Sequence, residues 1–149
     1  MRINQQLAAG KAEYPTIASL AAIGDGRSMA LVGPDGNVEW FCPQRFDATP
    51  MIWPLLDRQR GGRLQLSTPG DVKTHYLDDS AVLEFEVHSA SGSARVTLCM
   101  EWPGSDDQQR LLWQVDGLAG RCEFTLQFEP RPDFGSVAGE ASISAEGLT

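Results

Sequence analysis

Apolar and polar residues alternate with a period of two through much of the second half of the chain. The run LEFEVH at 83–88 has an apolar side chain at every second position, and RVTLCM at 95–100 repeats the pattern after a turn at 89–93. Only an extended strand places alternate side chains on opposite faces. The two runs therefore predict a β-hairpin with one buried and one solvated face.

Further strands are expected on both sides of this hairpin. Leu111, Trp113 and Val115 are spaced as the apolar face of one strand, and residues 117–120 predict the turn that ends it. Residues 122–129 alternate most regularly, and residues 141–145 predict a weaker last strand.

The first half of the chain contains a second hairpin pattern. In residues 28–42, two apolar runs flank the turn sequence GPDGN at 33–37. Residues 43–57 contain three prolines, so they predict a structured loop with at most a short helical turn near 52–56. A short strand is expected at 63–67, with Leu64 and Leu66 on one face.

Together these elements predict an all-β fold, an antiparallel β-sandwich with short connecting loops and at most one or two helical turns. We expect a leader or arm at 1–14 and a single sandwich domain at 15–149. The last strand has no obvious partner. This unpaired edge predicts a chain that is cut before a further domain, or an edge used in assembly.

Composition narrows the function classes. The net charge is −8, and lysine and arginine form no basic stripe, which disfavours nucleic-acid binding. No apolar run is long enough for a membrane span or a signal segment, so we expect a cytoplasmic protein. The three cysteines are far apart and follow no metal-ligand spacing, and the two histidines lie far from any cysteine pair, so we expect reduced thiols, no metal and no cofactor.

The main candidate for chemistry is the stretch from Ile23 to Asp47, which includes Asp25, Trp40 and the loop Arg45, Phe46 and Asp47. Arginine and aspartate can bind hydroxyls while phenylalanine stacks, which is typical of a polar tip that meets a sugar or a neighbouring domain. The alternative is an internal Arg45–Asp47 ion pair that stabilises the loop.

The tryptophans divide into two groups. Trp40 and Trp113 alternate with polar neighbours as core residues do, whereas Trp53 and Trp102 adjoin prolines and are the better candidates for a sugar platform.

Motifs for catalysis are absent from the sequence. There is no G-x-S-x-G elbow and no glycine-rich phosphate loop. Glu84 and Glu86 share a strand face with His88, which we interpret as a solvated sheet face. Cys42 is interpreted as a buried, inert thiol. No catalytic residue is therefore predicted in this chain.

A collinear series of short motifs runs from about Pro15 to Gly135. Its members are IGD at 23–25, ALV at 30–32, DG at 35–36, VEW at 38–40, Cys42, RFD at 45–47, LLD at 55–57, GG at 61–62, QVDGLAG at 114–120 and FEPRPDFG at 128–135. The series resembles the amino-terminal, trehalase-like domain of glycoside hydrolase family 15. Two departures are LCME at 98–101, where that family has an Asp-Phe-Met-Pro-like run, and Ala48 in place of a serine.

The resemblance implies a β-sandwich that precedes an (α/α)6 barrel, in which two glutamates perform inverting hydrolysis of an α-glucosidic bond. Neither glutamate is expected in this chain. The implied role is a non-catalytic accessory domain that braces the barrel of the same polypeptide and shapes its cleft rim, with Asp25, Trp40, Arg45, Phe46 and Asp47 as rim or interdomain candidates. The α-glucoside would be met only by the full enzyme.

Two further expectations concern partners. The alternative function is a free-standing β-sandwich that binds carbohydrate or protein through exposed aromatics and its open edge. The same edge, or an exposed apolar face, also predicts self-association.

Overall fold

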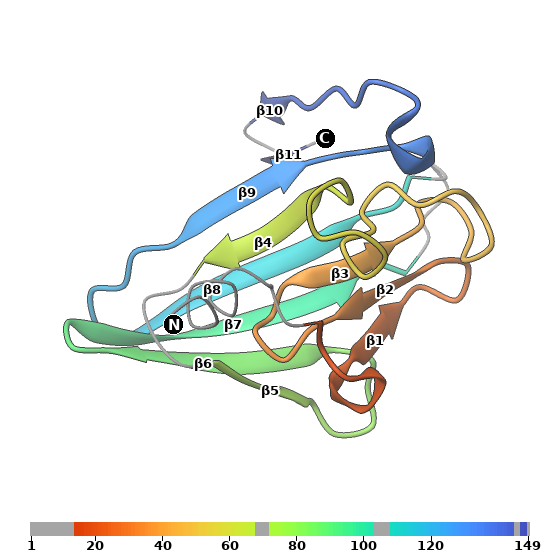
Figure 1. The fold of residues 1–149 in the computed structure, drawn as a ribbon. Helices are drawn as coiled ribbons and strands as arrows, with labels where there is room; N and C mark the ends of the chain where they lie inside the picture. The colour runs from red at the N-terminus through yellow and green to blue at the C-terminus, as the bar shows by residue number, and fades with distance from the viewer. Residues whose placement is uncertain (1–13, 68–71, 103–107, 145–146, 149) are drawn as a thin grey trace, which may run out of the picture.

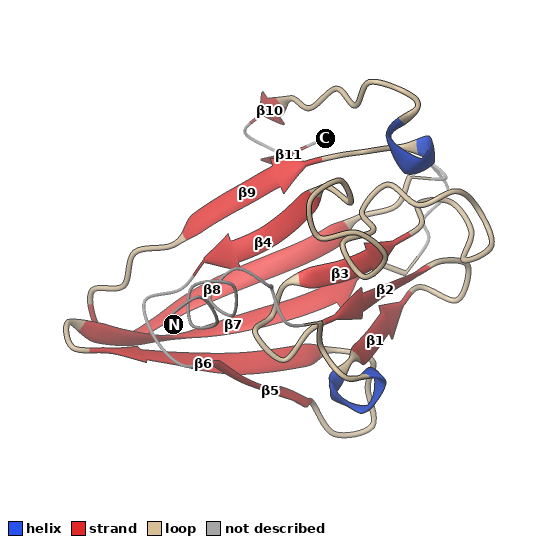
Figure 2. Cartoon of the chain, viewed as in Figure 1, coloured by secondary structure: helices blue, strands red, loops and turns tan. Residues whose placement is uncertain are grey.

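The computed structural model describes residues 14–67, 72–102, 108–144 and 147–148, and antiparallel strands dominate it (Figures 1 and 2). The predicted leader at 1–14 lies, apart from Tyr14, outside the described residues. The strands are β1 (Ala21–Gly24), β2 (Met29–Val32), β3 (Val38–Phe41), β4 (Arg63–Ser67), β5 (Val72–Tyr76), β6 (Leu83–Ser89), β7 (Gly92–Met100), β8 (Leu111–Gly120), β9 (Thr125–Glu129), β10 (Ile143–Ser144) and β11 (Gly147–Leu148). Two short 3-10 turns, at Ile17–Ser19 and Asp133–Gly135, are the helical elements of the described residues.

The strands form two facing layers. One layer is the sheet β5-β6-β7-β8, and the other contains β1-β2-β3 and the pair β4-β9. Every pairing is antiparallel, and β10 pairs with β11 in a separate short hairpin. The predicted all-β sandwich is confirmed.

The core lies between the layers and follows the alternation of β6 and β7. Leu83, Phe85 and Val87 are almost completely buried, whereas the intervening residues are partly or fully exposed. On β7, Ala94, Val96, Leu98 and Met100 are buried in the same way. The opposite layer contributes buried side chains from β1 to β4, namely Ile23, Ala30, Val32, Val38, Phe41, Leu64 and Leu66.

Both predicted hairpins are confirmed. β6 pairs with β7 around a turn at 90–91, and β2 pairs with β3 around the turn at 33–37. That turn is closed by the Gly33 amide, which donates to the Asn37 carbonyl over 2.8 Å. The expected strand at 63–67 is β4. A turn lies within the expected 52–56 segment, where the Leu56 amide donates to the Trp53 carbonyl over 3.0 Å.

The predicted turn at 117–120 is wrong. β8 continues to Gly120 and pairs with β7 along its whole length, with a bulge opposite Ser93 and Ala94. Gly92 and Gly120 allow a close backbone approach here, because a Cβ on Gly92 would collide with the Ala119 carbonyl oxygen and a Cβ on Gly120 with the Ser91 carbonyl oxygen. The strand expected from Cys122 begins only at Thr125, and it pairs with β4.

Other differences concern elements that the pattern did not resolve. β1 and β5 have no clear period-two alternation and were not expected as strands. Val115, expected on the apolar face of its strand, is 44% exposed. The weak strand expected at 141–145 is reduced to β10, and residue 145 lies outside the described residues.

We expect Gly36→Ala to destabilise the fold by about 2–4 kcal/mol. Gly36 has a positive φ of 79°, and a Cβ there would lie 2.9 Å from the Phe85 ring of the opposite layer. The control is Gly117→Ala, because a Cβ at Gly117 would meet nothing within 4 Å, so its change should stay within about 0.5 kcal/mol. Urea denaturation measures both, and equal midpoints for the two variants would contradict this packing.

Candidate functional site

Three segments meet at the end of the sandwich where β3 and β7 finish (Figure 1). They are the β1–β2 turn at 25–28, the loop at 42–48 after β3, and the described parts of the β7–β8 connection. The Phe46 amide donates to the Arg27 carbonyl over 3.1 Å. In the same turn, the Trp102 ring lies against Gly26, where an added Cβ would come within 3.4 Å of it. We call this region the loop end.

Asp25 is the buried polar centre of the loop end. The residue is only 2% exposed. Oδ1 accepts hydrogen bonds from the Arg27 amide (2.8 Å) and the Ser28 amide (2.7 Å), and Oδ2 accepts one from Gln109 Nε2 (3.1 Å). Burial raises the pKa of Asp25, but these hydrogen bonds together outweigh it and hold the pKa below its ordinary value.

Gln109 connects Asp25 to the next loop. Its Oε1 accepts a hydrogen bond from the Gln44 amide, so one side chain joins the β1–β2 turn to the segment before Arg45. Ser28 Oγ adds a second connection by donating to the Cys42 carbonyl. Gln44 itself has a left-handed φ of 72°, which turns the chain sharply at this point. The position of the 43–48 loop therefore depends on Asp25 and its neighbours.

The Arg45, Phe46 and Asp47 side chains form the exposed tip of that loop. Arg45 donates through Nε to Asp47 Oδ1 and through Nη2 to Asp47 Oδ2, each over 2.9 Å. This ion pair raises the pKa of Arg45 and lowers that of Asp47. The internal contact considered from the sequence is thus present. An exposed ion pair contributes little stability, so its main effect is to orient both side chains beside Phe46, which is 66% exposed.

Two of the four tryptophans, Trp53 and Trp40, are placed differently from expectation. Trp53 is buried, donates from Nε1 to the Arg131 carbonyl over 2.8 Å and contacts Phe134 edge-on, so its predicted role as an exposed platform is wrong. Trp102 is 77% exposed. Trp40 is only half-buried and Trp113 packs at the margin of the core. The loop end thus presents two exposed aromatic rings, Phe46 and Trp102, from two segments that contact the same turn.

A second buried carboxylate, missed by the sequence reasoning, lies away from the loop end. Glu39 is buried on β3, and Arg58 Nη1 donates to its Oε1 (2.8 Å) and Oε2 (2.6 Å). The Tyr14 ring covers the Arg58 guanidinium at 5.1 Å. Burial raises the pKa of Glu39, although Arg58 opposes this shift. The pair borders a pocket of about 200 Å³ and fixes the 54–62 loop against β3. The only signal in the sequence was an acid inside an apolar strand.

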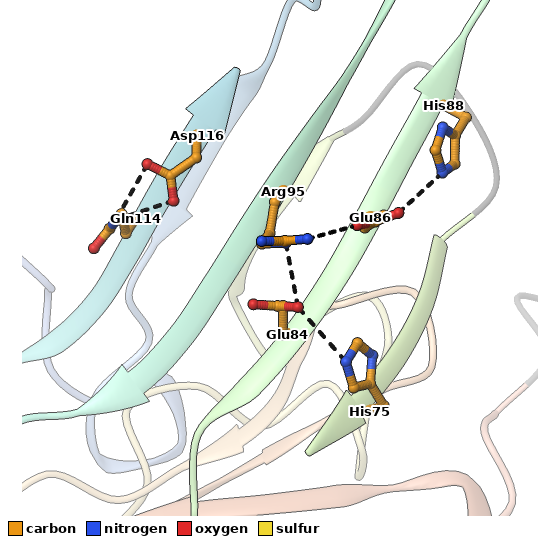
Figure 3. Close-up of polar contacts among 7 residues, drawn as sticks. All are labelled: His75, Glu84, Glu86, His88, Arg95, Gln114 and Asp116. Atoms are coloured by element: carbon orange, nitrogen blue, oxygen red, sulfur yellow. Dashed lines mark hydrogen bonds and ion pairs between the residues drawn. The ribbon is translucent and has the colours of Figure 1, made fainter. Parts of the chain in front are cut away.

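The outer face of the β5-β6-β7-β8 sheet carries a polar ladder (Figure 3). Arg95 lies between Glu84 (3.3 Å) and Glu86 (2.9 Å), and each glutamate is also close to a histidine, His75 at 3.6 Å and His88 at 3.3 Å. On β8, Gln114 donates to Asp116. Paired charges on an exposed sheet face support the interpretation of a solvated surface.

Three further observations concern the thiols, metal binding and membrane-spanning helices. All three cysteines are free, and burial raises the pKa of the Cys42 and Cys99 thiols, which keeps them protonated. Within the described ranges, no three side chains suited to a metal ion gather in one place. No helix in the described part of the chain is long and apolar enough to cross a membrane.

Comparison with known proteins identifies the family of the chain. The chain belongs to the trehalase-like, N-terminal family, whose model matches residues 5–149. It is similar to a trehalase of Mycobacterium tuberculosis, with 27% identity over 89% of this chain, and to a trehalase of Thermoplasma volcanium, with 31% identity over 44% of it. The chain spans only 22% and 10% of those two proteins. No solved structure matches the chain significantly.

We expect Asp25→Asn to lower stability at pH 7 by about 1–3 kcal/mol. The asparagine amide would face Gln109 Nε2, donor against donor. Because the folded pKa of Asp25 lies below its unfolded value, the carboxylate stabilises the fold above about pH 4 and loses this effect as pH falls through the folded pKa. The variant should therefore lose less stability on acidification than the natural chain.

Urea denaturation at pH 7 and pH 3 tests this expectation. Asp116→Asn is the matched control, because that exposed carboxylate bonds only to Gln114 in the described structure. A loss for Asp25→Asn no larger than for the control at pH 7 would show that Asp25 does not hold the loop end together.

Proposed function

We propose that this chain is a non-catalytic, amino-terminal accessory domain of a longer glucoamylase- or trehalase-type glycoside hydrolase that acts on α-glucosidic bonds. One observation carries the proposal: a trehalase-like N-terminal family matches nearly the whole chain, yet the chain spans only 22% of a similar trehalase. The catalytic residues then belong to the part of the polypeptide that follows, an (α/α)6 barrel.

The carboxylates of the described residues support a non-catalytic role. Glycoside hydrolysis needs two carboxyl groups that flank a bond in a cleft, one with a raised pKa. Glu39 has a raised pKa, but both of its oxygens accept from Arg58. Asp25 is held by three donors, and Glu84 and Glu86 share Arg95. These groups serve the fold, and none is paired across an open cleft.

The loop end is the surface we assign to the barrel and its cleft rim. Phe46 and Trp102 present exposed rings, which stack on sugar faces or pack in an interdomain contact. Arg45 and Asp47 supply donors and acceptors beside Phe46. Asp25 acts behind them by fixing the loop, and the half-buried Trp40 lies in β3 just before it. The proposed role is to brace the barrel and shape the rim.

The second candidate is a free-standing module that binds carbohydrate or protein. The observation that favours it is the same pair of exposed rings, because a sugar platform does not require a second domain. The two functions differ in where sugar is bound: titration of chain 1–149 alone with trehalose, maltose and isomaltose gives binding only for the free-standing module.

In the full natural polypeptide, we expect Phe46→Ala and Asp47→Ala to raise KM for the α-glucoside roughly three- to thirtyfold, with a smaller change in kcat. Both remove a rim contact and leave the barrel acids in place. Leu56→Ala is the control, since Leu56 is a similarly exposed apolar residue outside the loop end. Kinetic constants for all three variants that match the natural enzyme would contradict a rim role for this loop.

A further inference from the structure

The two layers of the sandwich meet along two long sides, and these sides differ in how well they cover the core. On one side, the edge strands β1 and β5 close over the core. Tyr76 of β5 reaches the backbone of β1, where its hydroxyl accepts from the Ala22 amide (2.7 Å) and donates to the Ala22 carbonyl (2.8 Å). Ile23 beside it is almost completely buried. This side of the core is sealed by a side chain that also satisfies backbone groups of the β1 edge.

The other side, between β8 and β9, is open. Val115 of β8 lies opposite Val96, which is fully buried, so its side chain points into the sandwich, yet Val115 is 44% exposed. Leu126 of β9 lies opposite the buried Leu66 and is 46% exposed. Inward-facing apolar residues in a complete sandwich are covered by the facing layer. On this side, the inward-facing Val115 and Leu126 are exposed to solvent.

Both strands on the open side also lack a backbone partner on their outer edge. Within the described residues, β8 pairs with β7 alone and β9 pairs with β4 alone. β8 is ten residues long and presents an unpaired edge of that length. A long edge with apolar side chains next to it is a template for a further strand. Among the residues that the structure describes, this location therefore has neither a hydrogen-bonding partner nor an apolar cover.

We propose that a β-strand from the polypeptide after Thr149 pairs with the β8 edge and covers Val115 and Leu126. The inference rests on the proposed function, because it takes this chain as the first part of a longer enzyme. The matching family is an N-terminal one and the chain spans 22% of a trehalase, so most of a relative's chain follows this region. A second copy is the weaker occupant, because each copy carries a charge of −8 whereas a tethered strand has a high local concentration.

Amide hydrogen exchange of the natural, unmutated polypeptide tests the proposal without a variant. In the full polypeptide, we expect alternate amides of β8 to exchange at least tenfold more slowly than in chain 1–149. The amides of β5, the opposite edge of the same sheet, are the internal control and should exchange equally in both. Equal exchange of β8 in the two polypeptides overturns the proposal, as does a natural polypeptide that ends at Thr149.

A matched pair of variants identifies the covered face. Val115→Glu and Leu112→Glu lie on the same strand with exposures of 44% and 43%, but Leu112 is opposite Cys99 on the outer face. In the full polypeptide, Val115→Glu should abolish the slow exchange of β8 and Leu112→Glu should retain it. Retention in both variants, or loss in both, overturns the assignment of the inward face.

Two outcomes distinguish the tethered strand from a second copy of the chain and from the proposed function. A doubled mass of chain 1–149 by light scattering, with slow β8 exchange that depends on concentration, identifies a second copy and overturns the tethered strand. A full polypeptide that protects β8 but hydrolyses no α-glucoside supports this inference and contradicts the proposed function.

Discussion

Apolar side chains on the inward faces of β6 and β7 pack against the opposite layer, and this packing positions the other parts of the sandwich. Phe85, Val96 and Leu98 are fully buried there. The same contact sets the positions of both ends of the sandwich. The β2–β3 turn approaches Phe85 through Gly36, and Ile23 and Phe41, which precede the two main loops of the loop end, belong to the same apolar cluster as Leu83 and Leu98. The hydrophobic layer thus fixes where the polar loops begin.

Buried carboxylates then hold the loops in place. Asp25 collects donors from its own turn and from Gln109, and Glu39 is paired with Arg58 of the loop that follows β3. Each satisfies nearby polar groups that burial would otherwise leave unpaired. Because these acids hold the loops in place, the exposed tip of Arg45, Phe46 and Asp47, together with the exposed Trp102, is the part of the loop end that can meet another surface. This division of roles is what we expect of an accessory domain.

The sequence was most informative where a local pattern determines the structure. Strict alternation predicted β6 and β7, and the GPDGN turn predicted the β2–β3 hairpin, because both depend on neighbouring residues alone. Local patterns were misleading where distant contacts decide the structure. Gly117 and Gly120 indicated a turn, but pairing with β7 extends β8 to Gly120, where a Cβ would collide with the Ser91 carbonyl oxygen. Likewise, a proline beside Trp53 did not reveal that its ring is buried and bonded to Arg131, 78 positions later.

The candidate site was predicted in part for the same reason. Asp25 and the 45–47 loop were identified from their motifs, and the Arg45–Asp47 pair is local. The partner that joins them, Gln109, is 84 positions from Asp25 and carries no motif of its own. The Glu39–Arg58 pair has no recognisable spacing either. The 44% exposure of Val115 depends on how far other strands cover β8, and no pattern within one strand reports that.

The most direct test of the central claim is glucose release from trehalose, maltose and isomaltose, measured for chain 1–149 and for the same chain with its natural downstream sequence. We predict release by the longer polypeptide alone, since the buried carboxylates Asp25 and Glu39 are engaged in contacts within the sandwich. Release by chain 1–149 itself would contradict the account, because it would place a working acid and base within the domain described as accessory.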